Sequence, residues 1–212
     1  MSAMSSSTSA ARGVVGLVIA GGRSVRFGGE KAVAELAGRP LLIWAAGRLK
    51  ASCSAVAVNA RPGTETEALA RVSGLEVLHD EAGDAQGPLA GVKVGLMWAE
   101  RLGVGSLAVS PCDAPLLPDD LFVRLIEAAG AGAAMAETAD GRQPLCAVWP
   151  VSALVTVKEA LAHGAHPATW MVLDRVAAKH VVFSRAEAFA NVNTRPELAA
   201  VAARLQAGAP RP

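Results

Sequence analysis

One segment of the chain concentrates residue types that bind phosphate. It contains four glycines, two arginines and one lysine within eleven positions, Gly21-Gly22-Arg23-Ser24-Val25-Arg26-Phe27-Gly28-Gly29-Glu30-Lys31. Glycines let backbone N–H groups approach phosphate oxygens closely and tolerate a positive φ. Arg26 would add a planar fork of donors, and Lys31 a mobile point charge. The segment therefore predicts a loop that binds the phosphates of a nucleotide.

The spacing within this segment excludes two common phosphate loops. A Walker A loop requires G-x-x-x-x-G-K-[ST], whereas Lys31 is followed by Ala32. A Rossmann fingerprint requires G-x-G-x-x-G, which the segment lacks. The alternative is an ordinary glycine-rich turn with surface charges, and the density of glycine and basic residues disfavours it.

Asp113 is the second residue whose type and position indicate chemistry. It lies in Ser110-Pro111-Cys112-Asp113-Ala114-Pro115, directly after a predicted buried strand. A carboxylate in such a place is costly unless it caps a backbone or binds a metal. Mg²⁺ takes one or two carboxylates together with substrate phosphates, so Asp113 beside a triphosphate would suffice. We therefore predict Asp113 as a Mg²⁺ ligand, and we expect Cys112 to serve packing.

Composition limits the classes of protein to consider. The 212 residues are 52% hydrophobic with a net charge of +1, which fits one α/β domain and predicts no nucleic-acid or membrane partner. The three cysteines match no metal-ligand or C-x-x-C spacing, which indicates reduced thiols and a cytoplasmic protein. Residues 1–13 are Ser-rich without an apolar core. We expect a disordered leader there and one domain over 14–212.

Short β-branched runs alternate with longer helical patterns, which is typical of βαβ units on a parallel sheet. Strands are expected at 14–20, 55–59, 75–78, 106–110, 133–136, 143–150 and 179–183. Helices are expected at 41–50, 64–72, 89–101, 119–129, 151–163 and 196–206. This order predicts a single three-layer α/β domain with a mostly parallel central sheet.

The polar and glycine-rich residues follow the predicted strands. The glycine-rich segment follows the first strand, Asn59 ends the second, Asp80 closely follows the third and Asp113 follows the fourth. Ligands of such sheets bind outside the carboxyl ends of the strands. The sequence therefore predicts that these residues meet at one edge of the sheet.

The glycine-rich segment also resembles a known signature. Residues 19–31, I-A-G-G-R-S-V-R-F-G-G-E-K, resemble the A-G-G-x-S-x-R-x-G-x-[DE]-K loop of the nucleotidyltransferases that act on the molybdenum cofactor, most closely the guanylyltransferases. The similarity runs from Val14 to the final helix. It implies a Rossmann-like nucleotidyltransferase fold whose loop cradles the triphosphate of GTP. Glu30 departs from the family, which usually has Asp there; the charge is kept and the reach is longer.

The resemblance implies further roles in nucleotide binding. Asn59 looks like an asparagine near the nucleotide, although a turn residue would also fit. Asp80 resembles the aspartate that recognises guanine, since a carboxylate accepts hydrogen bonds from N1–H and the 2-amino group; Glu81 and Asp84 are nearby competitors. Gly87 and Pro88 begin a helix whose N–H groups suit an anion or a base, or simply an ordinary helix start. The implied nucleotide-binding residues are Ile19, Ala20, Gly21, Gly22, Lys31, Asn59, Asp80, Gly87, Pro88 and Asp113.

Two stretches resemble acceptor-binding segments. Asn191-Val192-Asn193-Thr194 resembles N-[IV]-N-T-P-E, with Arg195 inserted before the proline. Alternating asparagines on an extended segment would point two amides to the same side, and the alternative is an N-cap for the last helix. Arg142 begins an R-x-P-L stretch. We predict Arg142, Asn191 and Asn193 as acceptor-binding residues.

The resemblance implies transfer of GMP from Mg²⁺-bound GTP to the terminal phosphate of molybdopterin, with release of pyrophosphate. Arg26, Lys31 and Asp113 are the predicted catalytic residues, and a molybdoenzyme or its chaperone would receive the product. The alternatives are a molybdopterin cytidylyltransferase, a sugar-phosphate nucleotidyltransferase, and a non-catalytic nucleotide- or cofactor-binding subunit. The sequence Ala20-Gly21-Gly22 favours guanylyl transfer by resemblance, and the presence of all three catalytic candidates disfavours a binding subunit.

Overall fold

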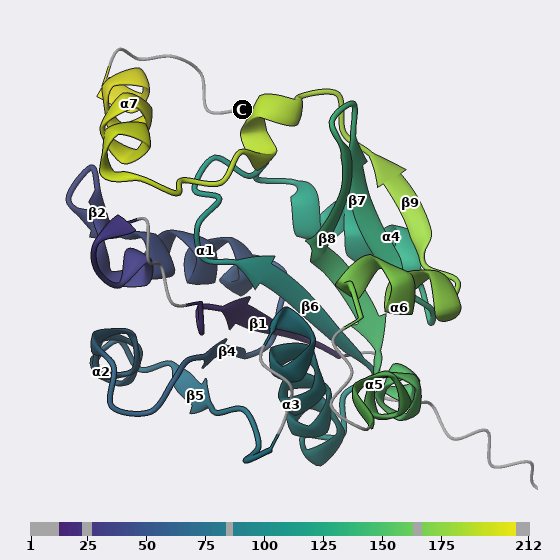
Figure 1. Ribbon diagram of the computed structural model, residues 1–212. Helices are drawn as coiled ribbons and strands as arrows, with labels where there is room; N and C mark the ends of the chain where they lie inside the picture. Colours follow the sequence, from purple (N-terminus) through teal and green to yellow (C-terminus); the bar gives the residue numbers. More distant parts are fainter. Residues whose placement is uncertain (1–12, 23–26, 84–86, 163–166, 207–212) are drawn as a thin grey trace, which may run out of the picture.

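The computed structural model describes residues 13–22, 27–83, 87–162 and 167–206 (Figure 1). Residues 1–12 of the predicted leader, and the predicted catalytic residue Arg26, lie outside the described residues. Asp84, one of the competitors for the guanine-binding role, lies outside them as well.

A seven-stranded sheet with the order β5-β4-β1-β6-β8-β7-β9 forms the middle layer. Its strands are β1 (Val14–Ile19), β4 (Val56–Asn59), β5 (Glu76–Leu78), β6 (Ser106–Pro111), β7 (Ala134–Thr138), β8 (Gly141–Pro150) and β9 (Lys179–Val182). Strand β8 runs antiparallel to both its neighbours, and every other pairing is parallel. The mostly parallel sheet predicted from the sequence is confirmed.

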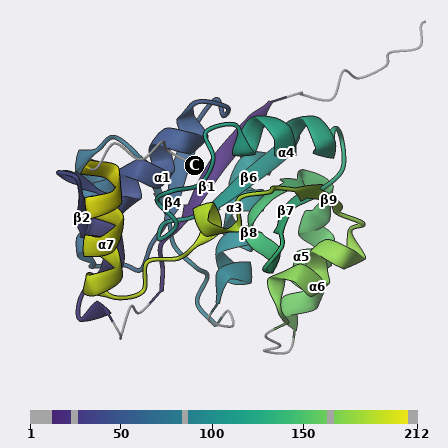
Figure 2. The same cartoon turned by 90° about the horizontal axis from the view of Figure 1, so that it is seen from above.

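Helices cover both faces of the sheet and make the outer two layers (Figure 2). One face carries α1 (Leu41–Lys50), α2 (Glu65–Val72) and α4 (Leu121–Ala129). The other face carries α3 (Pro88–Arg101), α5 (Leu154–Leu161) and α6 (Thr169–Arg175). Outside these layers, α7 (Arg195–Gln206) packs against a hairpin of β2 (Glu35–Leu36) and β3 (Arg39–Pro40). Short 3-10 turns are η2 (Lys31–Val33), η3 (Val151–Ala153) and η5 (Ala186–Phe189).

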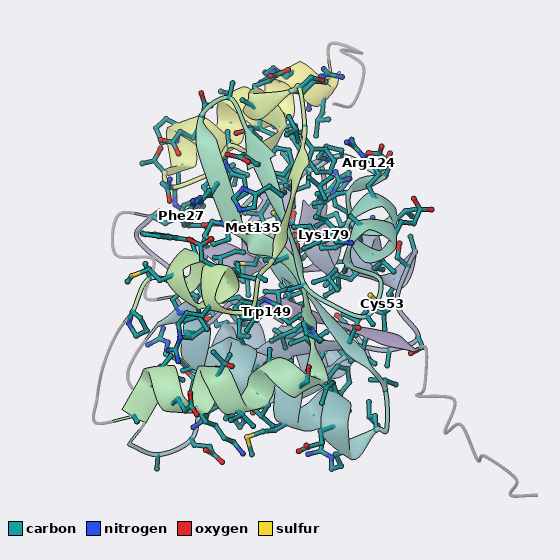
Figure 3. The ribbon with its side chains drawn as sticks, turned by 90° about the vertical axis from the view of Figure 1, so that its right-hand side faces the viewer. Phe27, Cys53, Arg124, Met135, Trp149 and Lys179 are labelled. Carbon is teal, nitrogen blue, oxygen red and sulfur yellow. The ribbon has the colours of Figure 1, made fainter. Side chains whose placement is uncertain are left out.

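Strand β1 shows why the apolar runs in the sequence are nearly continuous. Val15 and Leu17 face the core under α3, whereas Val18 faces the core under α1, because neighbouring side chains on a strand point to opposite faces. A strand buried on both faces needs apolar residues at every position. Met135 of β7 and Trp149 of β8 lie in the α3-side core, and Figure 3 marks their places in the sheet.

Three features of the fold were not predicted. The β2–β3 hairpin turns through Ala37 and Gly38, whose φ values are 51° and 73°. This is a two-residue hairpin turn, in which an asparagine or glycine would have been expected at the first position. The predicted helix over 151–163 is also divided, because η3 precedes α5, and α6 was missed because it is only seven residues long.

The strand order places a topological switch point between β1 and β6. From β1 the chain proceeds through α1 to β4 on one side, whereas β6 lies on the other side and is reached through α3 on the opposite face. The crevice outside the carboxyl ends of such strands is the usual ligand site. No helix within the described ranges is both long and apolar enough to cross a lipid bilayer.

Gly16 allows α1 to pack directly on β1. A Cβ atom built at position 16 would lie 2.9 Å from the Cβ of Leu49, a buried residue of α1, so the helix would have to move. We expect Gly16→Ala to lower the free energy of unfolding by about 1–3 kcal/mol, measured by urea denaturation.

Gly132→Ala is the matched control. Gly132 is exposed, and a Cβ there would meet only the Ala129 carbonyl oxygen at 3.5 Å, an ordinary contact. We expect its free energy of unfolding to change by no more than about 0.5 kcal/mol. Equal effects of the two substitutions would contradict the packing argument.

Candidate active site

A cleft of about 700 Å³ opens at the carboxyl ends of β1, β4 and β6. It is lined by every residue that the sequence predicted to bind the nucleotide, namely Ile19, Ala20, Gly21, Gly22, Lys31, Asn59, Asp80, Gly87, Pro88 and Asp113. Asn193 lines it too. Residues from five separate parts of the chain thus meet at the edge of the sheet where ligand binding was expected.

Lys31 joins three segments of the chain at the floor of this cleft. Its Nζ donates to Asp113 Oδ2 at 2.8 Å and to Asn193 Oδ1 at 2.9 Å, and the residue is only 8% exposed. Hydrogen bonds between an ammonium and a carboxylate are stronger than neutral ones. The two described residues of the predicted catalytic set, Lys31 and Asp113, are therefore in direct contact.

The backbone around Asp113 holds the C-terminal segment in place. Asp113 lies two residues after the end of β6, and its carbonyl oxygen accepts a hydrogen bond from the Val192 N–H at 2.8 Å. Val192 is buried, which fixes the segment that carries Asn191 and Asn193 beside the end of β6. Asn193 thereby reaches the cleft although it lies 80 residues after Asp113 in the sequence.

Asn59 orients Asp80 at the other end of the cleft. Its side-chain Nδ2 donates to Asp80 Oδ1 at 2.8 Å and to the Leu78 carbonyl at 3.3 Å. Asn59 is 3% exposed, whereas Asp80 is exposed to the cleft. The carboxylate of Asp80 is therefore held in a fixed direction by a buried amide.

Gly91 of α3 makes room for this amide. A Cβ at position 91 would lie 2.5 Å from Asn59 Oδ1 and 2.8 Å from Ile19 Cδ1, which is closer than atoms can approach. Helix α3 can pack against the ends of β1 and β4 only because this residue is glycine. At the start of the helix, Gly87 supplies no capping side chain, which leaves its N-terminus suited to an anion or a base.

A smaller hollow of about 190 Å³ adjoins the cleft. The two share Pro111 and Leu145, and the smaller one is lined further by Ala114, Gln143, Pro144, Cys146, Phe189 and Asn191. Asn191 therefore lines this hollow, whereas Asn193 lines the main cleft. The amides of Asn191 and Asn193, which were expected on one side of the segment, therefore line two adjoining spaces.

Arg142 lines neither space. Its Nη1 donates to Asp174 of α6 at 2.9 Å, and its guanidinium lies 5.0 Å from the ring centre of Trp170. On a strand, Arg142 and the hollow-lining Gln143 point to opposite faces. The structure does not bring Arg142 to the cleft, and its role in acceptor binding stays a prediction.

The cleft also contains residues that the sequence analysis missed. Arg61 and Thr64, from the segment between β4 and α2, and Thr66, from the first turn of α2, line its wall, as does Glu30. Arg61 follows Asn59 by two positions, so the end of the second strand was the available signal. Thr64 caps α2 through its side chain, which accepts a hydrogen bond from the Glu67 N–H at 3.2 Å.

The donor set of the cleft fits a metal bound together with a substrate. Within the described ranges, no group of three or more His, Cys, Asp or Glu side chains could hold a metal ion alone. Asp113 provides one carboxylate in the cleft, and Mg²⁺ typically uses one or two carboxylates with phosphate oxygens and water. The residues present therefore fit Mg²⁺ brought in with a nucleotide.

The switch-point crevice, the glycines that line it and the lysine–aspartate pair are typical of an α/β nucleotidyltransferase. Residues 16–180 match the MobA-like NTP transferase domain, and the chain belongs to this family.

Sequence relatives cover nearly the whole chain. The molybdenum cofactor guanylyltransferase of Cereibacter sphaeroides is 37% identical over 187 residues, with 87% of this chain and 93% of that protein covered. The molybdenum cofactor guanylyltransferase of Cupriavidus taiwanensis is 39% identical over 201 residues, with 90% and 97% covered.

Solved structures share the fold at lower identity. Molybdopterin-guanine dinucleotide biosynthesis protein A of Archaeoglobus fulgidus superposes with a TM-score of 0.71 at 22% identity, covering 91% of this chain and 99% of that one. The 4-diphosphocytidyl-2C-methyl-D-erythritol synthase of Anaerococcus prevotii gives a TM-score of 0.71 at 12% identity, covering 92% and 96%. The predicted family and nucleotidyltransferase fold are confirmed.

Cys112 lines the cleft beside Asp113, yet its chemistry is that of a packed thiol. Burial, together with the nearby charge of Asp113, raises the pKa of the Cys112 thiol from 9.0 to about 12. Only the thiolate reacts with iodoacetamide. At pH 8 we expect Cys112 to be alkylated about a thousandfold more slowly than an unstructured cysteine peptide, measured by mass spectrometry of the labelled peptides.

The pH dependence provides the check. Because the thiol pKa is raised, the alkylation rate of Cys112 should still rise tenfold per pH unit between pH 8 and pH 10, while that of the free peptide levels off. Asp113→Asn should increase the rate, since it removes the neighbouring negative charge. A plateau near pH 9 would contradict the raised pKa.

Proposed function

We propose that the protein transfers GMP from Mg²⁺-bound GTP to the terminal phosphate of molybdopterin, with release of pyrophosphate. The observation that carries the proposal is the contact of Lys31 with Asp113 and Asn193 in a cleft whose far end carries the oriented carboxylate of Asp80. The names of the relatives at 37% and 39% identity, molybdenum cofactor guanylyltransferase, support the same reaction.

Asp80 is the proposed reader of guanine. Its Oδ1 accepts a hydrogen bond from Asn59, which holds the carboxylate at the wall of the cleft. A carboxylate accepts the two donors that guanine presents at N1 and the 2-amino group, whereas cytosine presents no such pair. The helix start at Gly87 and Pro88, together with Ile19 and Ala20 on β1, would line the space for the base and ribose.

Gly21, Gly22, Lys31 and Asp113 are the proposed triphosphate site, with Arg26 as a further cation. Asp113 would hold Mg²⁺ together with the phosphates, and the metal would supply charge neutralisation across the transferring group. Lys31 would stabilise the negative charge that develops on the α-phosphoryl group, since fixed cations act strongly in a partly buried site.

Asn193 and Asn191 are the proposed acceptor residues, with Arg142 a more distant candidate. The acceptor phosphate would lie between the cleft and the smaller hollow, where its oxygen attacks the α-phosphorus of GTP in line and pyrophosphate leaves. No general base is required, because a phosphate monoester is already ionised near neutral pH. A molybdoenzyme or its chaperone in the cytoplasm would then receive the product.

Pyrophosphate release with molybdopterin and Mg²⁺ tests the reaction. We expect release with GTP and not with CTP or ATP, and loss of release when EDTA removes the metal. Asp113→Asn should lower kcat by about a hundred- to a thousandfold, because the metal loses its protein carboxylate. Release with CTP in place of GTP would favour the cytidylyltransferase, and GTP binding without turnover would favour a binding subunit.

Substitution of Asp80 tests the reading of the base. Asp80→Asn should lower kcat/KM for GTP by about 30-fold, since hydrogen bonds to a charged acceptor contribute about 2 kcal/mol. Glu81→Gln is the control, because Glu81 lies on the same loop but pairs with Lys93 of α3 at 2.7 Å. A larger effect at Glu81 than at Asp80 would contradict the assignment.

A further inference from the structure

The side chain of Glu30 links the end of the glycine-rich segment, residues 27–31, to helix α2 through hydrogen bonds. One carboxylate oxygen accepts hydrogen bonds from the Thr66 N–H at 2.7 Å and from the Thr66 hydroxyl, and the other accepts from the Glu65 N–H at 3.2 Å. These N–H groups belong to the first turn of α2, where backbone donors lack partners within the helix. The glutamate side chain, which is longer than the aspartate usual in the family, therefore reaches from position 30 to α2.

The charge state of Glu30 agrees with this geometry. Burial alone would raise the pKa of its carboxyl group. The hydrogen bonds from Thr66 and Glu65, together with the charge of Arg61, outweigh burial and lower the pKa below its ordinary value. Glu30 therefore stays ionised at neutral pH and keeps all its acceptor sites.

Arg195 contacts the same loop from helix α7. Its guanidinium lies 5.4 Å from the ring centre of Phe27, which is 3% exposed. A Cβ at position 29 would lie 3.9 Å from Arg195 Nη2, so the guanidinium also lies near Gly29. An arginine above an aromatic face is attracted by the ring. Arg195, which is inserted into the N-x-N-T-P-E pattern, thus packs on the segment 27–31.

The start of α7 is fixed to the cleft by its own hydrogen bonds. Glu197 Oε2 accepts from the Asn193 N–H at 2.6 Å, and the Glu197 N–H donates to Thr194 Oγ1 at 3.3 Å. The hydrogen bond from the Asn193 backbone is the main reason that the pKa of Glu197 is lowered. This reciprocal cap places Arg195 at a defined point, two residues after the asparagine that accepts from Lys31.

We propose that Glu30 and Arg195 are positioning residues that hold the segment 27–31 between α2 and α7 and so fix Lys31 beside Asp113. The consequence for turnover rests on the proposed function of the cleft. Lys31 directly follows Glu30 and begins the turn η2, so a shift of Glu30 moves the Lys31 backbone. Helix α2 has a cap of its own in Thr64, which indicates that Glu30 serves more than the helix.

The hold of Glu30 and Arg195 on the segment 27–31 is a clamp between α2 and α7. Hydrogen exchange on the nucleotide-free protein tests this clamp directly. Glu30→Ala should speed exchange of the Glu65 and Thr66 amides at least about tenfold, because they lose their acceptor. It should also speed exchange at Val33 and Ala34, whose amides bond to Glu30 O and Lys31 O within the turn that carries Lys31. Arg195→Ala should speed exchange in 28–31 about threefold.

Matched controls separate the clamp from a general loss of charge. Glu35→Gln removes an exposed carboxylate from the neighbouring strand β2, and Arg204→Ala removes an exposed cation from α7. Neither should change exchange in these segments. Thr66→Val removes one partner of Glu30 and should act in the same direction as Glu30→Ala with a smaller effect. Faster exchange confined to Glu65 and Thr66 would overturn the proposal, because Glu30 would then only cap α2.

A double-mutant cycle tests whether Glu30 acts through Lys31. Glu30→Ala should raise the Kd for Mg²⁺-bound GTP about tenfold in the otherwise unaltered protein and less than about twofold in a Lys31→Ala background. Equal effects in both backgrounds would overturn the coupling. If the unaltered protein binds no GTP while exchange at Val33 and Ala34 rises as expected, the proposed function fails and the clamp stands.

Discussion

The ammonium of Lys31 is the point on which the arrangement of the site depends. It binds the carboxylate of Asp113, two residues beyond β6, and the amide of Asn193, in the segment before α7, at 2.8 and 2.9 Å. Among the described residues, no backbone hydrogen bond joins the loop after β1 to Asp113 or Asn193, whereas the segments of these two partners are joined to each other through Val192 and Asp113. The cation of Lys31 therefore connects that loop to the other two segments. A nearly buried lysine requires acceptors for its charge, and Asp113 and Asn193 provide them. The same cation would meet phosphate oxygens when a nucleotide enters.

The polar contacts at the two ends of the cleft differ in charge. Around Asp80 the contacts are an amide and a carboxylate held close to α3 by the absence of a side chain at Gly91. Around Asp113 the contacts are ionic and join distant segments. A nucleotide has a neutral base with donor and acceptor edges at one end and a polyanion at the other. The distribution of residue types along the cleft matches that polarity.

Much of this could be predicted from the sequence, because it follows from local pattern. The apolar runs predicted the strands. The rule that ligands bind at the carboxyl ends of strands correctly predicted that Asn59, Asp80 and Asp113 lie at one cleft. The contacts of Glu30 with Thr66, and of Arg195 with Phe27, could not be predicted, since they join side chains far apart in the sequence without any periodicity. The β2–β3 hairpin escaped notice because Ala37 is an unusual residue for its positive φ.

Helix α7 buries none of its side chains, although Arg195 in its first turn packs on Phe27 of the glycine-rich segment. Segments with little buried apolar surface open at a lower free energy than the core of the same protein. The seven-stranded sheet, with its two apolar cores, does not require α7 for its packing. The folding of the sheet and the placement of the terminal helix are therefore separate properties of this chain. We expect a preparation to retain its sheet structure and a normal melting transition after the terminal helix has detached and Arg195 has left Phe27.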